Sequence, residues 1–112
     1  MNDRSQFLKG CARTLVLQLL SERPMYGYEI ATALSARSQG IFALGQGTLY
    51  PLLYSLQAKG LIGVARDEAS PDGRLRRYYK LTAAGRERLT GDRTTWQDIA
   101  RGMRLVLGGA GA

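Results

Sequence analysis

The sequence predicts a mainly helical α+β fold, in which three helices are followed by a two-stranded hairpin and one further helix. Apolar residues recur at spacings of three and four in three early segments, which is typical of amphipathic helices. The spacing changes to alternation between residues 61 and 81, which is typical of strands. The length of 112 residues and the apolar content of 45% suit one globular domain.

Residues 7–21 and 27–38 are the first two predicted helices. Pro24 ends the first, because the residue before a proline avoids the helical region. Gly40 follows the second and is expected to adopt the left-handed conformation of a helix cap. The apolar positions are Leu8, Cys11, Ala12, Leu15, Val16, Leu19 and Leu20 in the first helix, and Ile30, Ala31 and Leu34 in the second.

Residues 47–59 are the third predicted helix, and Gly60 closes it. We place Pro51 in its first turn, where backbone N–H groups have no intrahelical partner and a proline is tolerated. Its apolar stripe consists of Leu49, Leu52, Leu53 and Leu56.

Residues 61–66 and 75–81 are the two predicted strands, joined by a polar loop over 67–74 that contains Pro71 and Gly73. Three helices followed by a hairpin is the plan of a winged helix-turn-helix. The expected domain therefore covers residues 1–82, with the hairpin as its wing.

Residues 83–112 are expected to form a C-terminal dimerisation helix with a frayed tail, capped at its start by Thr82. Two interpretations of its glycines stay open: Gly91 with Asp92 breaks the helix into two pieces, or Gly102 permits close approach of another helix. A short heptad-like stripe is formed by Leu89, Trp96 and Met103 together with Asp92, Ile99 and Val106.

The net charge of +7 and the isoelectric point of about 10.1 indicate a polyanionic partner, either nucleic acid or an anionic membrane surface. A merely soluble charged surface is the alternative. Cys11 is the one cysteine and histidine is absent, so zinc sites and Ser-His or Cys-His pairs are not expected. We therefore predict no enzyme, no metal and no cofactor. We also expect a cytoplasmic chain without membrane contact, because it has neither an apolar span nor a signal sequence.

The third helix would be the one that enters the major groove of double-stranded DNA. Since its leucine stripe must face the core, the opposite face is the candidate DNA-reading surface. That face carries almost no charge, and the alternative is that its tyrosines pack against neighbours. Its residues are Gln46, Gly47, Thr48, Tyr50, Pro51, Tyr54 and Ser55.

The hairpin is strongly basic, with Arg74, Arg76, Arg77 and Lys80 on one strand and Arg66 on the other. Between residues 74 and 88 six basic residues stand against one acid. A solvated charged face usually mixes both signs. We therefore expect the three arginines 74, 76 and 77 to contact phosphates, which position a protein on DNA without reading its sequence.

The last helix is expected to have little of its own domain to cover, so its apolar face should pack against a second copy of the chain. Trp96 serves either in this interface alone or as a platform on which planar aromatic ligands stack. The residues assigned to this dimer and effector surface are Trp96, Ile99, Met103, Val106 and Leu8.

Three motifs resemble the PadR family of transcriptional regulators: PMYGYEI at residues 24–30, GTLYPLLYSLQAKGLI at 47–62 and GRLRRYYKLTAAGRERL at 73–89. The resemblance runs from Phe7 to Trp96 and is closest to the short form with one C-terminal helix. It implies a winged helix and a homodimer formed through the terminal helices. It also implies palindromic operators in double-stranded DNA, and repression that a small aromatic, phenolic or drug-like molecule relieves.

The expected function is thus that of a dimeric, sequence-specific repressor. A winged helix that docks other proteins without binding DNA is the alternative, and the basic hairpin argues against it.

Overall fold

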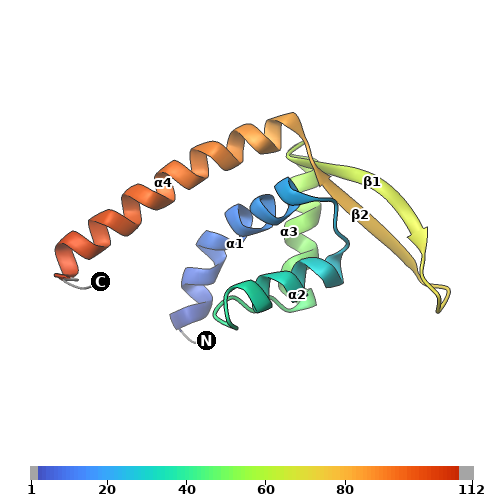
Figure 1. Cartoon of the computed structure of the whole chain (residues 1–112), viewed down its shortest axis with the longest axis horizontal. Helices are drawn as coiled ribbons and strands as arrows, with labels where there is room; N and C mark the ends of the chain where they lie inside the picture. Colours follow the sequence, from blue (N-terminus) through green and yellow to red (C-terminus); the bar gives the residue numbers. More distant parts are fainter. Residues whose placement is uncertain (1–2, 109–112) are drawn as a thin grey trace.

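The computed structural model describes the backbone of residues 3–108 and the side chains of residues 10–108. Three helices form a compact body, and the hairpin and the last helix project from opposite sides of it (Figure 1). The predicted mainly helical winged helix-turn-helix is confirmed. In chain order the elements are α1 (Asp3–Glu22), α2 (Gly27–Arg37), α3 (Gln46–Ala58), β1 (Ile62–Ala69), β2 (Leu75–Leu81) and α4 (Ala83–Leu107).

The core lies where α1, α2 and α3 meet the base of the hairpin. Leu17, Ile30 and Leu53 are completely buried there, one from each helix. Ile30 and Leu53 belong to the predicted apolar sets of their helices, whereas the sequence analysis did not assign Leu17 to the buried face of the first helix. The remaining large buried side chains of this cluster are Val16, Leu19, Leu20, Met25, Leu34, Leu49, Leu56, Leu61, Ile62, Tyr79 and Leu89.

The hairpin is longer than predicted. β1 continues through Ala69, so that only residues 70–74 form the turn and the expected loop over 67–74 is wrong in its first half. Asp67 lies opposite Arg77, and Glu68 lies opposite Arg76. Opposite charges across a strand pair favour pairing, which explains why this polar segment is a strand.

An isolated β-bridge extends the two-stranded sheet by one residue pair. Met25 pairs with Tyr79 through two backbone hydrogen bonds of 3.1 and 2.9 Å, which attach the segment before α2 to the outer edge of β2. The register of the hairpin shifts between Val64 and Arg66, a bulge that strengthens its local twist. The sequence analysis missed the Met25 bridge.

α4 is one continuous helix from Ala83 to Leu107, so Gly91 and Asp92 do not break it. Asp92 accepts hydrogen bonds from Arg13 Nε and Nη2 at 2.9 and 2.8 Å, and from Thr14 Oγ1 at 3.2 Å. The first half of α4 is thereby fixed to α1. The expectation that α4 has little of its own domain to cover is wrong for this half.

The start of α4 depends on a close backbone approach at Gly85. A Cβ atom at this position would clash with the carbonyl oxygen of Leu61, the residue that leads into β1. The predicted cap is confirmed, because the Gly85 N–H donates to Thr82 Oγ1 at 3.0 Å. The glycine therefore allows α4 to pack against the base of the wing.

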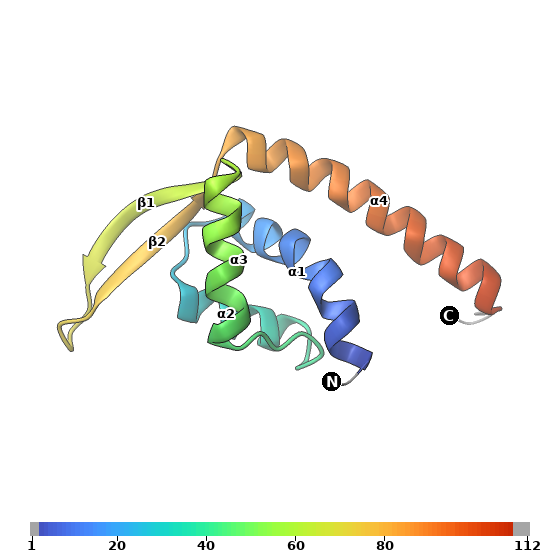
Figure 2. The ribbon, with the colours of Figure 1, turned by 180° about the vertical axis from the view of Figure 1, so that it is seen from behind.

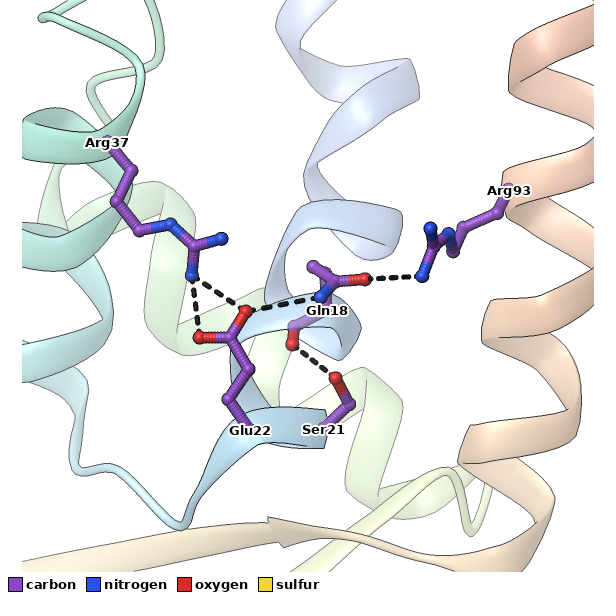
Figure 3. A network of polar contacts seen from close by, with 5 residues as sticks. All are labelled: Gln18, Ser21, Glu22, Arg37 and Arg93. Atoms are coloured by element: carbon purple, nitrogen blue, oxygen red, sulfur yellow. Dashed lines mark hydrogen bonds and ion pairs between the residues drawn. The ribbon is translucent and has the colours of Figure 1, made fainter.

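A polar network joins α2, α1 and α4 on the surface (Figure 3). Arg37 Nη1 donates to both carboxylate oxygens of Glu22, at 2.7 and 2.8 Å. Gln18 Nε2 donates to the same carboxylate at 3.1 Å, and Arg93 Nη1 donates to Gln18 Oε1 at 3.3 Å. The Arg37 guanidinium, followed by the Gln18 amide, lowers the pKa of Glu22.

Candidate nucleic-acid interface

An open groove of about 590 Å³ lies where three parts of the chain converge. The reverse view shows α3 on this side of the body, beside the base of the hairpin (Figure 2). The groove is lined by Tyr26, Gly27 and Tyr28 at the start of α2, by Gln46, Tyr50 and Tyr54 of α3, and by Ser70, Asp72, Arg74, Leu75, Arg76, Arg77 and Tyr79 of the wing.

The predicted reading face of α3 points away from the core. Gln46, Gly47 and Thr48 at the start of the helix are exposed, and so are Pro51 and Tyr54. Ser55 and Tyr50 are half-buried. The groove therefore presents polar and aromatic groups from a helix whose 13 residues include no charged side chain.

Pro51 is the sixth residue of α3, so its predicted place in the first turn is wrong. A proline here removes the hydrogen bond that residue 51 would donate to the carbonyl of Gly47. Gly47 is exposed, which leaves that carbonyl open to water. The cost of the missing bond is thereby reduced at the end of the helix that faces the groove.

The two tyrosines of α3 differ in how far their side chains are exposed to solvent. Tyr50 lies against the start of α2, where a Cβ atom on Gly27 would come within 2.6 Å of its hydroxyl oxygen. Tyr54 is 60% exposed, and its ring lies 6.3 Å from that of Tyr50. The alternative that the tyrosines pack against neighbours thus holds for part of the Tyr50 side chain. Most of the Tyr54 side chain faces solvent.

The charges of the wing are mixed, contrary to the expectation of a single sign. Arg77 Nε and Nη2 donate to the two carboxylate oxygens of Asp67, at 2.9 and 3.2 Å. Arg66 Nε donates to Glu68 at 3.0 Å. The Arg77 hydrogen bonds lower the pKa of Asp67, and the Glu68 carboxylate raises the pKa of Arg66. The sequence analysis counted acids only after residue 74 and so missed those on the facing strand.

The wing tip is a tight turn that holds Arg74 outward. Gly73 has φ of +85°, and its N–H donates to the Ser70 carbonyl at 2.9 Å. The Ser70 hydroxyl donates to Asp72, and this contact lowers the pKa of Asp72. The Arg74 side chain is 88% exposed and lies 3.9 Å from the nearest Asp72 oxygen. Its guanidinium is therefore the most accessible cation of the predicted wing set.

The second half of α4 exposes the predicted apolar stripe: Trp96 is 43% exposed, Ile99 58%, Met103 51% and Val106 86%. Leu105 and Leu107, which the sequence analysis did not assign, are also exposed. The side chain of Leu8, assigned to the same surface, lies outside the residues whose side chains the structure describes.

A cavity of about 270 Å³ separates α1 from α4 beside Trp96. It is lined by Thr14, Leu15, Gln18, Arg93, Trp96 and Gln97. Trp96 thus borders two surfaces, the exposed face of α4 and this cavity within one protomer.

None of the helices between residues 3 and 108 has the length and apolar character needed to cross a membrane. Among the side chains of residues 10–108, no cluster of cysteine and carboxylate groups offers three ligands to a metal ion.

Sequence and structure comparisons agree on one family. The model of the transcriptional regulator PadR-like family matches residues 16–91. A transcriptional regulator of Mycobacterium tuberculosis is 35% identical over 104 residues, which cover 93% of this chain and 90% of that protein. An uncharacterized protein of Lysinibacillus sphaericus is 30% identical over 106 residues, which cover 95% and 96% of the two chains.

The crystal structure of a PadR-like transcriptional regulator from Bacillus cereus is similar to this chain with a TM-score of 0.78 and 32% identity. The similarity covers 94% of this chain and 99% of that one. PadR-like proteins are transcriptional regulators and not enzymes, as the sequence predicts for this chain. The chain therefore belongs to the PadR-like family of transcriptional regulators.

Proposed function

We propose that this protein is a dimeric, sequence-specific DNA-binding repressor whose DNA site is the groove between α2, α3 and the wing. The observation that carries the proposal is the composition of that groove. A polar, uncharged helix face and a hairpin with several arginines line the same open space. Phosphate contacts and base contacts need these two kinds of surface.

The start of α3 supplies the proposed base contacts. Gln46 and Thr48 are exposed at the helix N-terminus, where residues of a recognition helix meet base edges. Gly47 adds no side chain, so the backbone can approach a phosphate closely. The full set proposed for this surface is Gln46, Gly47, Thr48, Tyr50, Pro51, Tyr54 and Ser55.

The wing supplies the proposed phosphate contacts through Arg74, Arg76 and Arg77. These arginines line the groove opposite α3. A duplex held between the helix and the wing would meet them with its backbone. Such contacts release counterions, so binding should weaken steeply with salt.

The second half of α4 supplies the proposed dimer interface. Its exposed stripe of Trp96, Ile99, Met103 and Val106 is apolar, and contiguous apolar surface on a small protein marks an interaction site. A two-fold axis at this stripe would present two α3 helices to successive major grooves, about 34 Å apart. The proposed division is a DNA-binding part, residues 1–82, and a part of residues 83–112 that contains the dimerisation helix α4. The start of α4 also belongs to the core of the DNA-binding part, because Leu89 is buried there.

The effector is proposed to be a small aromatic molecule held beside Trp96. The pocket between α1 and α4 has a mainly apolar wall, and the basic residue Arg93 is among those that line it. A phenol or an aromatic acid fits this combination better than a cation does. Trp96 is the one tryptophan of the chain, so quenching of its fluorescence reports binding directly.

The test is a selection of genomic fragments by gel shift, followed by a footprint. A retained fragment with a two-fold symmetric footprint supports a dimeric regulator. The double variant Ile99→Asp with Met103→Asp should lose the symmetric footprint while keeping its circular dichroism spectrum. A wild-type protein that retains no fragment at low salt would favour the docking alternative and contradict the proposal.

A further inference from the structure

One face of the wing, together with the adjoining Tyr26, carries a set of aromatic rings and guanidinium groups. Arg76 and Tyr78 share this face, because alternate residues of a strand point to the same side. Tyr26 comes from a distant part of the chain. Its neighbour Met25 is bridged to Tyr79, which brings Tyr26 alongside β2. The bridge thus places a second aromatic side chain, besides Tyr78, next to Arg76.

These side chains form an arginine–tyrosine ladder consisting of Arg76, Tyr26, Tyr78 and Arg66. Arg76 Cζ lies 4.8 Å from the centroid of the Tyr26 ring. The rings of Tyr26 and Tyr78 meet edge to face at 5.2 Å, and Arg66 Cζ lies 3.9 Å from the Tyr78 centroid. All three separations are those of favourable cation–π and aromatic contacts.

Arg76 differs from its neighbours in the kind of partner it has. Arg77 and Arg66 give their Nε–H groups to carboxylates. Arg76 makes no ion pair with any side chain of residues 10–108, although Glu68 lies opposite it in the strand register. Glu68 is engaged by Arg66 instead.

The partner determines what a guanidinium can still bind. A carboxylate cancels the charge and occupies N–H donors that a phosphate would need. A tyrosine ring attracts the guanidinium through its face, which leaves the N–H edge and the positive charge available. Arg76 is thus held in place without losing its capacity to bind an anion.

We propose that the ring of Tyr26 positions Arg76 to bind a DNA phosphate and makes it a stronger phosphate contact than the neighbouring Arg77. This role rests on the proposed function, because it requires a duplex in the groove that Arg76 shares with Gln46 and Tyr54. A guanidinium already ordered in the free protein loses less conformational freedom on binding than a mobile one. Tyr26 is a positioning residue, and Arg77 contributes less because it must first exchange the Asp67 carboxylate for a phosphate.

The first experiment compares Arg76→Ala with Arg77→Ala. Binding to a mixed-sequence DNA duplex is followed by fluorescence anisotropy over a salt series. Arg76→Ala should flatten the plot of log K against log salt by about 0.9, the slope of one phosphate contact, and Arg77→Ala should flatten it by less. An equal or larger loss in Arg77→Ala overturns the proposal. Failure of the wild type to bind any duplex at low salt would instead contradict the proposed function.

The second experiment tests Tyr26 by a double-mutant cycle on the same duplex. Tyr26→Phe keeps the ring face and should bind like the wild type. Tyr26→Leu should weaken binding about two- to fivefold, the equivalent of one exposed cation–π contact. The loss should vanish when Arg76→Ala is already present.

A Tyr26→Leu effect that persists unchanged in the Arg76→Ala background overturns the positioning role. Circular dichroism checks that each variant is folded. Should Tyr26→Leu fail to fold, Tyr26→Met repeats the cycle, because it keeps apolar bulk beside the Met25 bridge while removing the ring.

Discussion

α3 and the hairpin face the same groove with different chemistry. The helix has no charged side chain in 13 residues, whereas the hairpin carries five basic and three acidic ones between residues 62 and 81. In the proposed function the helix offers groups that distinguish bases, and the hairpin offers groups that bind any phosphate. The contrast predicts that DNA affinity and sequence selectivity are carried by separate elements, so that variants should change one without the other.

The largest effect is expected from a substitution at the junction between the wing and α4. Gly85→Ala places a Cβ atom against the Leu61 carbonyl, a backbone group that cannot turn aside. We expect a loss of about 3 kcal/mol or more in the free energy of unfolding, measured by urea denaturation.

Gly91→Ala, in the same helix, is the matched control, since a Cβ atom there meets nothing within 4 Å. It should be neutral or stabilise by up to about 1 kcal/mol. Equal destabilisation by both substitutions would show that the Leu61 contact is not what makes Gly85 necessary.

The next largest effect, on DNA affinity, is expected when the phosphate contacts proposed for the wing are removed. The triple variant Arg74→Ala, Arg76→Ala, Arg77→Ala should weaken binding to every duplex alike. Its salt slope should fall by about 1.8 or more, at roughly 0.9 for each of at least two phosphate contacts. Anisotropy on an operator and on an unrelated duplex measures both quantities. A variant that loses operator binding alone would contradict the assignment of the wing.

A smaller effect, confined to the operator sequence, is expected from a substitution in α3. Gln46→Ala should cost about 1–3 kcal/mol of binding free energy on the operator, as for one base contact. Binding to an unrelated duplex and the salt slope should stay at the wild-type values. Competition gel shifts check this, with Gln57→Ala as control, an exposed residue of the same helix that does not line the groove.

The smallest effect concerns the acid that opposes Arg77. Hydrogen bonding to Arg77 lowers the pKa of Asp67 in the folded chain. The ion pair therefore stabilises the fold above the ordinary aspartate value of 3.8, and this contribution is lost as the pH falls through the lowered pKa.

Asp67→Asn should accordingly have a slightly lower Tm than the wild type at neutral pH, by a small amount because the pair is exposed. The difference should shrink in acid. The same variant should steepen the salt slope of DNA binding, since Arg77 no longer has a carboxylate partner. A Tm difference between the wild type and Asp67→Asn that grows on acidification would contradict the stabilising role of the Asp67–Arg77 pair.

Much of the fold could be predicted from the sequence because periodicity depends only on neighbours along the chain. The leucine stripe of α3 identified the buried face and, by exclusion, the exposed one that includes Gln46 and Tyr54. Thr82 and Gly40 behaved as local cap signals predict, the first as acceptor of the Gly85 N–H and the second with φ of +80°.

The missed features depend on contacts between distant segments. Opposite charges at Asp67 and Arg77 meet only once the strand register is known, and Tyr26 reaches Arg76 only through the Met25 bridge. The need for glycine at residue 85 is explained by the carbonyl group of Leu61, which is distant in the sequence. Alternation of Arg76, Tyr78 and Lys80 along β2 was the one available signal that a ring would share a face with an arginine.

The central claim, that duplex DNA occupies the groove between α2, α3 and the wing, is tested most directly by NMR. Backbone amide shifts of the labelled protein are followed while a mixed-sequence duplex is added. The claim predicts the largest changes at residues 26–28, 46–54 and 70–77, with little change from residue 96 to 107. Changes concentrated on α4, with the groove residues unmoved, would contradict it.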